Sequence, residues 1–241
     1  MTEERFAERS RSERRRRWKR IALAVLAVAV AAALVWMIWF SSVLAVRDVE
    51  VAGRTTLKQS QVLQAADVPL GRPLARVDVA AIEGRVAGLE RVDTVEVSRS
   101  WPRTLSISIV ERSTVVWASF DGEIRGIDKH GLDYRSYSSA PKGTIEAKIT
   151  VADPDDRLET SKSVVDVVRL IGAKDRALRQ DIQSISAGTK DSIELNLTEG
   201  RTVVWGSSDD GERKITVLRS LLGIDAARYD VSAPDQPTTR Q

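Results

Sequence analysis

The chain has 241 residues, of which 42% are apolar, and a formal net charge of +3. This length and apolar content suffice for one large or two small folded cores, so a chain disordered throughout is excluded. There is no cysteine and only one histidine, which excludes a disulfide framework and leaves most zinc sites without their ligands.

Residues 1–20 form a strongly basic N-terminal tail. They carry nine Arg or Lys and four acidic side chains, a net charge of +5, so the rest of the chain is net −2. Beside a membrane segment such a run more often fixes topology and touches anionic lipid headgroups than binds DNA or RNA. We therefore expect membrane lipid, and no nucleic acid, as its partner. The cations are Arg5, Arg9, Arg11, Arg14, Arg15, Arg16, Arg17, Lys19 and Arg20.

Residues 21–40, IALAVLAVAVAAALVWMIWF, contain no polar side chain. As a helix this stretch would be about 30 Å long, the thickness of the hydrocarbon core of a bilayer. Trp18, Trp36 and Trp39 lie where interfacial aromatic residues are expected. The alternative is a cleaved signal peptide, with Val43-Leu44-Ala45 as the cleavage site. The stretch exceeds the usual signal core of ~7–15 residues, which favours an uncleaved transmembrane helix.

The charge on the two sides of this span predicts its orientation. Nine cations precede it, and only Arg47 follows soon after it. By the positive-inside rule the N-terminus is cytoplasmic, and everything from about residue 41 onward is extracytoplasmic. We therefore expect a single-pass, type II membrane protein.

The first part outside the span is predicted to begin with a strand, two helices and a strand. VRDVEVAG alternates apolar and polar residues and stops at Gly53, as a strand before a turn does. Two stretches then have helical spacing of apolar residues, separated by a Pro- and Gly-containing break. The first helix is expected at 56–67, with an apolar face of Leu57, Val62, Leu63 and Ala66. The second is expected at 78–90, with Asp78 as its N-cap and Ile82, Val86 and Leu89 on its face, before a strand at 91–100.

A third strand follows in SRSWPRTLSISIVER, residues 98–112. Leu105, Ile107 and Ile109 alternate with serines, which predicts one buried and one solvated face. We expect the last two strands to form a hairpin through Trp101-Pro102-Arg103, with Trp101 closing the edge of the core. Stacking of this basic and aromatic corner on bases is the competing interpretation, but a single Trp is too little for it. Two helices on one face of a small sheet are the predicted architecture.

After residue 113 the pattern changes to short strands separated by Gly, Asp and Pro. We predict a second, mostly β domain with two helices, at 157–174 and 209–224. The second helix is expected to bury Ile215, Leu218, Leu221 and Leu222. Strands are expected at 114–120, 122–131, 143–152, 181–188, 192–200, 201–208 and 227–232, and the last residues are too polar and Pro-rich to pack.

The residues that could carry chemistry do not form a recognisable site. His130 lies in a predicted hairpin turn. Asp153 to Asp156 and Asp209-Asp210 could supply calcium ligands, but neither run has the alternating oxygen ligands of a known loop. They are more typical of a solvated turn and of a helix N-terminus. We therefore predict no enzymatic activity, no metal, no cofactor and no small-molecule substrate.

Taken together, the tail, the span and the two domains resemble the FtsQ (DivIB) family of bacterial cell-division proteins. The stretches VRDVEVAGRTTL and GRPLARVDVAAIEGRVAGLERVDTVEVSRSWPRTLSISIVER are similar to its POTRA domain. Thr114 is a departure, because relatives usually have Pro there, which hardly disturbs the fold. The resembling POTRA positions are Gly53, Arg99, Trp101, Pro102, Glu111 and Arg112.

The resemblance implies a single-pass membrane protein with an α+β ectodomain. A POTRA domain of order β-α-α-β-β is followed by a mostly antiparallel β domain with two helices. The expected segments are a cytoplasmic tail at 1–20, the transmembrane helix at 21–40, the POTRA domain at 46–113, the β domain at 114–231 and a disordered tail at 232–241.

The resemblance also implies a scaffold at the division septum that does no chemistry. Such proteins bind FtsB and FtsL outside the membrane and act through them on the septal peptidoglycan synthase. In relatives FtsB adds a strand to the last strand of the second domain, and an unpaired edge offers main-chain donors and acceptors for such pairing. The corresponding edge here is Ala227, Arg228, Tyr229, Asp230 and Val231, with Tyr229 expected as the anchor side chain.

Two other classes of protein remain as alternatives. A POTRA-bearing component of protein transport or envelope assembly would be expected to have a barrel or further repeats, and the chain has neither. An exported hydrolase would need an acid or nucleophile site, which the sequence does not indicate.

Overall fold

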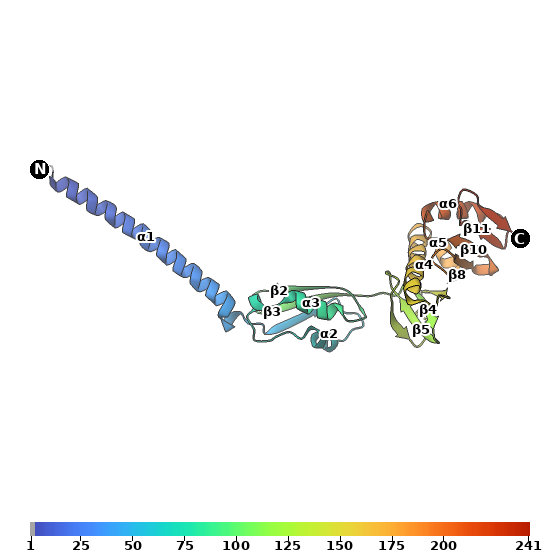
Figure 1. Cartoon of the computed structure of the whole chain (residues 1–241), viewed down its shortest axis with the longest axis horizontal. Helices are drawn as coiled ribbons and strands as arrows, with labels where there is room; N and C mark the ends of the chain where they lie inside the picture. Colours follow the sequence, from blue (N-terminus) through green and yellow to red (C-terminus); the bar gives the residue numbers. More distant parts are fainter. Residues whose placement is uncertain (1–2) are drawn as a thin grey trace. The chain divides into compact units, whose positions relative to one another are not determined.

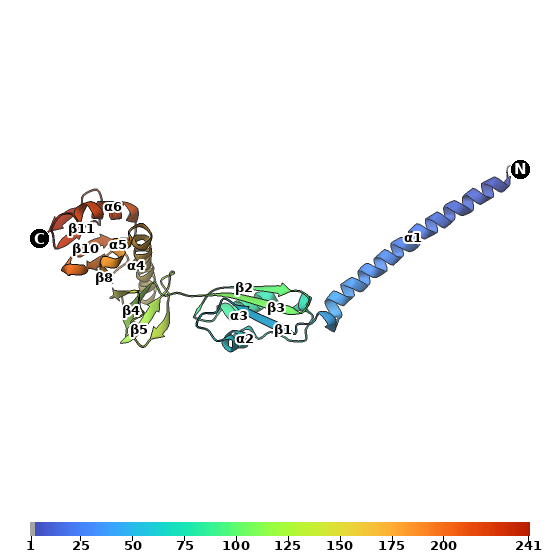
Figure 2. The same ribbon diagram turned by 180° about the vertical axis from the view of Figure 1, so that it is seen from behind.

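The computed structural model describes residues 3–241, with side chains from residue 17 onward (Figures 1 and 2). The chain divides into two compact units, with the boundary between Val110 and Glu111. The first unit contains a long N-terminal helix and a small α+β domain. The second is a larger domain built on one sheet.

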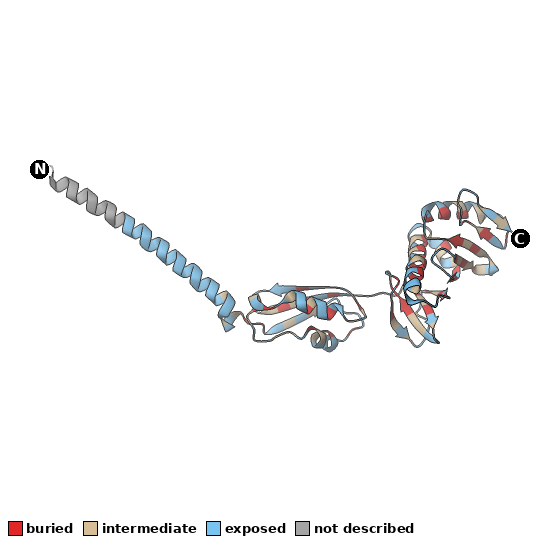
Figure 3. Ribbon diagram, in the orientation of Figure 1, coloured by how far each residue is buried: buried red, intermediate tan, exposed pale blue. Residues whose placement is uncertain are grey.

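Helix α1 runs from Glu3 to Phe40, and its section from Arg17 to Phe40 is long and apolar enough to cross a membrane. The side chains of this section are almost all exposed in the structure, as a surface that contacts lipid should be (Figure 3). By its length and composition this section agrees with the predicted membrane-spanning helix. The helix starts before residue 21 because the preceding segment is rich in Arg and Glu, which favour helix. The predicted lipid contacts of side chains 1–16 lie outside the described residues.

The α+β domain has the predicted order of elements. Val49 and Val51 of the first strand pair in parallel with Leu105 and Ile107 of the third, which lies in the middle of the three-stranded sheet. The prediction of a strand-helix-helix-strand-strand domain is confirmed. The elements are β1 (Asp48–Ala52), α2 (Gln59–Ala66), the short 3₁₀ helix η2 (Leu74–Arg76), α3 (Val79–Ala87), β2 (Val92–Ser100) and β3 (Thr104–Glu111).

The core of this domain contains the side chains expected from the periodicity. Leu105, Ile107 and Ile109 of β3 are at most 1% exposed, and they pack with the apolar faces of α2 and α3. Asp78 caps α3 as predicted, because its carboxylate accepts a hydrogen bond from the main-chain N–H of Ala81. Trp101 differs from the prediction. Its side chain is 52% exposed, so it does not close the edge of the core.

The second domain, Glu111–Gln241, is built on a nine-stranded sheet in the order β12-β11-β10-β9-β8-β7-β4-β5-β6. Most neighbouring strands are antiparallel, as expected; the pairs β10–β11, β4–β7 and β7–β8 are parallel. The strands are β4 (Val116–Phe120), β5 (Glu123–Ile127), β6 (Asp133–Tyr137), β7 (Ile145–Ile149), β8 (Ile182–Ala187), β9 (Ile193–Leu197), β10 (Thr202–Gly206), β11 (Arg228–Asp230) and β12 (Thr238–Arg240).

The helices of this domain are α4 (Pro154–Lys174), α5 (Arg176–Asp181) and α6 (Gly211–Leu221). Ile171 of α4 and Leu218 of α6 are fully buried and belong to one continuous apolar core with the sheet. This core appears as the buried positions of α4, α6 and the central strands in Figure 3. The predicted apolar face of α6 is confirmed at Ile215 and Leu218, whereas Leu221 and Leu222 are only partly buried.

The structure corrects the predicted elements in four places. Strand β6 and helix α5 were not expected, so the domain has three helices rather than two. Helix α4 starts at Pro154 with Asp153 as its N-cap, so the acidic run at 153–156 is a helix N-terminus rather than a solvated turn. The fourth correction concerns the C-terminal residues 232–241. They are not a disordered tail, because β12 pairs with β11.

Candidate functional site

Two POTRA positions hold the first domain together. The guanidinium group of Arg99, on β2, donates hydrogen bonds to the carbonyl oxygens of Leu74 (3.0 Å) and Val77 (2.7 Å). It therefore ties the sheet to the segment that precedes α3. Gly53 has a φ of +79° in the turn after β1, a conformation that favours glycine. Both residues have structural roles in this domain.

The remaining POTRA positions lie at strand ends. The Trp101-Pro102 peptide is cis and lies in the turn between β2 and β3, where a proline that cannot donate to a ladder is tolerated. Glu111 is the last residue of β3. Arg112, which follows it, forms an ion pair with the buried carboxylate of Asp128.

Asp128 organises the turn that contains the single histidine. Its carboxylate accepts hydrogen bonds from the main-chain N–H groups of His130 (2.8 Å) and Leu132 (3.0 Å). The predicted hairpin turn around His130 is confirmed, because it joins the antiparallel strands β5 and β6. In this part of the chain the ionisable groups maintain a turn.

The position that departs from the family pattern, Thr114, makes contacts that proline cannot. Its hydroxyl group hydrogen-bonds to the hydroxyl groups of Tyr134 (2.9 Å) and Tyr137 (2.7 Å), both on β6. Burial raises the pKa of Tyr134 to about 12. The Thr114 side chain therefore connects the first residues of the second domain to β6, the outermost strand at one end of its sheet.

The predicted partner-binding residues, 227–231, do not form an open edge. The main chain of Ala227 accepts a hydrogen bond from Thr202 N–H, and Val231 N–H donates to the carbonyl oxygen of Val204, so this segment pairs with β10 on one side. On the other side, β11 pairs with β12. The prediction that this segment is the terminal edge is wrong, because residues 238–240 return to cover it.

Tyr229 is also differently placed from the prediction. Its side chain is 1% exposed and packs in the core of the second domain with Trp205 and Leu218. Its hydroxyl group donates a hydrogen bond to the carbonyl oxygen of Ile224 (2.8 Å). Since the side chain is already buried within its own domain, Tyr229 is not available as an anchor for a partner. The expectation that Tyr229 is the anchor is wrong. Its side chain instead packs in the core and supports β11 from within the domain.

The side chains that β11 presents to solvent are Arg228 and Asp230, one residue to either side of Tyr229. The guanidinium group of Arg228 forms an ion pair with Glu194 of β9 at 2.7 Å. Arg228 lies opposite Arg240 of β12, and Asp230 lies opposite Thr238. These four residues of β11 and β12 line a small surface pocket of about 160 Å³.

The register determines which main-chain groups remain free at this end of the sheet. The main-chain N–H and C=O groups of residue 229 point toward β10, so those of residues 228 and 230 point toward β12. Their partners, Arg240 and Thr238, must then face β11, because successive residues of a strand alternate in direction. The N–H and C=O groups of Thr239 therefore point away from the sheet. Within the sheet they form an edge to which another strand could be added.

Comparison with known proteins adds the following similarities. Residues 44–112 match the family model of the POTRA domain, FtsQ-type. The chain is 36% identical over 211 residues to the cell division protein FtsQ of Streptomyces bingchenggensis, which covers 86% of this chain and 80% of that protein. It is 34% identical over 228 residues to the cell division protein FtsQ of Streptomyces collinus, which covers 91% of this chain and 86% of that protein. The identity with the cell division protein FtsQ of Mycolicibacterium smegmatis is 35% over 208 residues, which covers 86% of this chain and 61% of that protein.

Proposed function

The chain belongs to the FtsQ family of bacterial cell-division proteins, and on that premise we propose that it is a non-enzymatic scaffold of the division complex. Its extracytoplasmic part binds partners of the FtsB and FtsL type and through them influences the septal peptidoglycan synthase. Membership of the family itself supports a role in division and protein partners within the division complex. The alternative, a transport component, is not adopted because the similar proteins named above are cell-division proteins.

The observation that carries this proposal is the unpaired edge of β12. Strand β12 is the outermost strand at one end of the nine-stranded sheet, and it pairs only with β11. An exposed edge binds an extended segment through main-chain hydrogen bonds, and side chains beside it select the segment. We assign the main-chain hydrogen bonding to Thr239. The selection of the bound segment is assigned to the side chains of Arg228, Asp230 and Arg240. Residues 227–231 thus contribute to the site through their exposed side chains rather than as its edge.

A proline substitution at position 239 tests this arrangement. Proline is tolerated on an edge strand where its N–H would face solvent, so Thr239→Pro is expected to leave β11–β12 pairing intact while removing the outward donor. The control is Thr239→Ala, which keeps the N–H group. Full-length variants in nanodiscs are mixed with the FtsB- and FtsL-type proteins of the same organism, and the bound fraction is measured.

We expect Thr239→Pro to weaken partner binding at least about tenfold and Thr239→Ala to change it little. Equal binding by the two variants would remove main-chain pairing at β12 as the mechanism. Proline at Ala227 or Val231 is a poorer test, because both N–H groups donate within the domain, to Arg240 and Val204. Either substitution would damage the sheet itself.

The topology is proposed as type II, with the N-terminus in the cytoplasm and the protein at the septum. The basic residues before the span support this orientation. Because the chain has no cysteine, single cysteines can report on it. A membrane-impermeant maleimide added to intact spheroplasts should label Ser139→Cys, which is at an exposed position, and not Ser10→Cys. The opposite labelling pattern would contradict the proposed orientation, because it would place the N-terminus outside the cytoplasm.

A further inference from the structure

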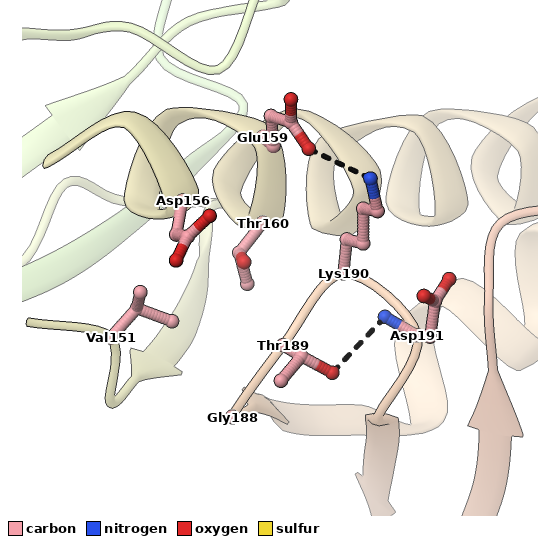
Figure 4. Close-up of a pocket in the computed structure, with 8 residues that line it drawn as sticks. All are labelled: Val151, Asp156, Glu159, Thr160, Gly188, Thr189, Lys190 and Asp191. Carbon is pink, nitrogen blue, oxygen red and sulfur yellow. Dashed lines mark hydrogen bonds and ion pairs between the residues drawn. The ribbon is translucent and has the colours of Figure 1, made fainter. Parts of the chain in front are cut away.

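The second domain has a pocket of about 270 Å³ that is separate from the β11–β12 edge. It lies between the first two turns of α4 and the loop that joins β8 to β9, as the close-up in Figure 4 shows. Its volume suits one side chain rather than a large ligand. The residues that line it are Val151, Asp156, Glu159, Thr160, Gly188, Thr189, Lys190 and Asp191.

The charge lining this pocket is predominantly negative. Its one cation, Lys190, lies 2.8 Å from a carboxylate oxygen of Glu159, and each group favours the charged form of the other. The hydrogen bond from Lys190 lowers the pKa of Glu159, and Glu159, with smaller contributions from Asp191 and Asp156, raises the pKa of Lys190. Among the described residues, neither Asp156 nor Asp191 forms an ion pair. Besides the Glu159–Lys190 ion pair, the lining therefore carries two further carboxylates, those of Asp156 and Asp191.

Thr160 provides an independent indication that the pocket takes a ligand. Its side chain is 2% exposed, it comes from α4, and it lies in the middle of the lining residues in Figure 4. Within residues 17–241 its hydroxyl group makes no hydrogen bond. By contrast, the hydroxyl group of Thr216 in α6 donates to the carbonyl oxygen of Glu212 at 3.0 Å. The hydroxyl oxygen of this otherwise buried residue is not fully enclosed, so it is open to the pocket, and a group that enters can bond to it.

The lining also restricts the chemical class of the ligand. Anions are disfavoured by the carboxylates of Asp156, Glu159 and Asp191. In the part of the chain that the structure describes, no group of three His, Cys, Asp or Glu side chains is arranged to hold a metal ion. An organic cation matches the negative lining. A guanidinium group has five donors in one plane and can bond to carboxylate and hydroxyl oxygens at the same time.

We propose that this pocket binds one arginine side chain of a partner protein, with the guanidinium group bonded to Asp156 and to the hydroxyl oxygen of Thr160. Asp191 adds charge attraction from the opposite wall, and the Glu159–Lys190 ion pair closes one side. This contact is a second one, formed by different elements from those that carry the β12 edge. Its failure would leave the proposed pairing at β12 untouched.

The test uses N-acetyl-arginine amide as the probe and the neutral isostere N-acetyl-citrulline amide as its control. The full-length protein is placed in nanodiscs, and the methyl resonances of Val151 and Thr160 are followed by NMR during titration. We expect saturable shifts with the arginine probe that weaken as salt is raised, and no saturable shifts with citrulline. Equal responses to the two probes would overturn the proposal, because charge recognition would be absent.

Variants then assign the contact to particular groups. Asp156→Asn should weaken binding of the arginine probe about tenfold, and Thr160→Val, which removes the hydroxyl group at nearly constant shape, should weaken it severalfold. The matched control is Asp155→Asn, one residue earlier in the same helical turn but outside the pocket lining. It should bind as the unmodified protein does. If Asp155→Asn and Asp156→Asn weaken binding equally, the effect is general electrostatics and the pocket assignment is wrong.

Discussion

Gly53 lies directly against the main chain of Ile109, such that a Cβ atom at position 53 would be 1.9 Å from the Ile109 carbonyl oxygen. No side chain fits at that distance, so the turn after β1 requires glycine for space as well as for its φ of +79°. Contact between this turn and β3 thus fixes the start of the domain against its central strand.

Gly71 separates the two requirements, because it has a φ of +81° but no neighbouring atom within 4 Å of the place that a Cβ atom would take. Gly71→Ala should cost about 1–2 kcal/mol of stability from its backbone conformation alone. Gly53→Ala should cost about 1–3 kcal/mol more, from overpacking. Hydrogen exchange of β3 amides measures both. Similar losses for the two variants would show that the main chain near Ile109 moves away at little cost.

Arg99 should matter through its hydrogen-bonding geometry rather than its charge. Arg99→Ala removes both main-chain contacts, to Leu74 and Val77, and is expected to destabilise the first domain by about 1.5–3 kcal/mol. Arg99→Lys should recover only part of the loss, because an ammonium group cannot reproduce the planar fork of donors. Urea unfolding, with hydrogen exchange to assign the domain, tests this. Full recovery by lysine would contradict the geometric role.

Substitutions at Tyr229 should mainly lower the stability of the second domain, whereas substitution of Arg228 should mainly weaken partner binding. Tyr229→Ala is expected to cost about 3–5 kcal/mol of stability because it empties a buried site, and Tyr229→Phe about 1 kcal/mol because it removes the bond to Ile224. Arg228→Ala removes only an exposed ion pair and should cost less than about 1 kcal/mol, yet weaken partner binding. Thermal unfolding and partner binding are measured for each. Loss of binding in Tyr229→Phe with unchanged stability would restore Tyr229 as a direct contact.

Asp175 should make the second domain sensitive to acid. A main-chain hydrogen bond from Leu178 and, secondarily, the side chain of Arg219 lower the pKa of Asp175. Between the folded and unfolded pKa values the unfolded chain binds more protons. The stabilisation is therefore complete above the unfolded pKa of about 4 and is lost as the pH falls through the folded value.

Asp175→Asn is the informative variant, because asparagine still caps α5 while the charge is lost. At pH 7 it should be less stable than the unmodified protein by about 0.5–1 kcal/mol, since Arg219 is half exposed. That difference should shrink as the pH is lowered from 5 to 2. Urea unfolding across this range provides the measurement. A difference that does not change with pH would exclude the Asp175 carboxylate as its source.

Elements with a strong local signal were predictable. An unbroken apolar run specifies a membrane helix, and alternation specifies the buried face of β3, because both are consequences of backbone geometry acting on neighbouring residues. The cap at Asp78 is local in the same way. Helix α5 and strand β6 were not predicted because each is short and has too few residues to establish a period.

The candidate site was only partly predictable. The sequence pattern and the resemblance led to the correct end of the sheet, but β11 was taken for its edge and Tyr229 for a surface residue. Residues 232–241 are polar and contain two prolines, so their composition favours disorder. Strand β12 nevertheless forms there, because main-chain hydrogen bonds to β11 do not depend on which side chains the segment carries.

The amino-acid sequence by itself therefore determined the membrane helix, the order of elements in the first domain and the family. These depend on periodicity, capping and motif residues close together in the chain. Only the tertiary structure decided which strand is outermost and which side of β11 is buried. Pairing with β10 sets the orientation of Tyr229 toward the core, and pairing with β12 covers the segment 227–231. Both are contacts between segments distant in sequence, which no local pattern records.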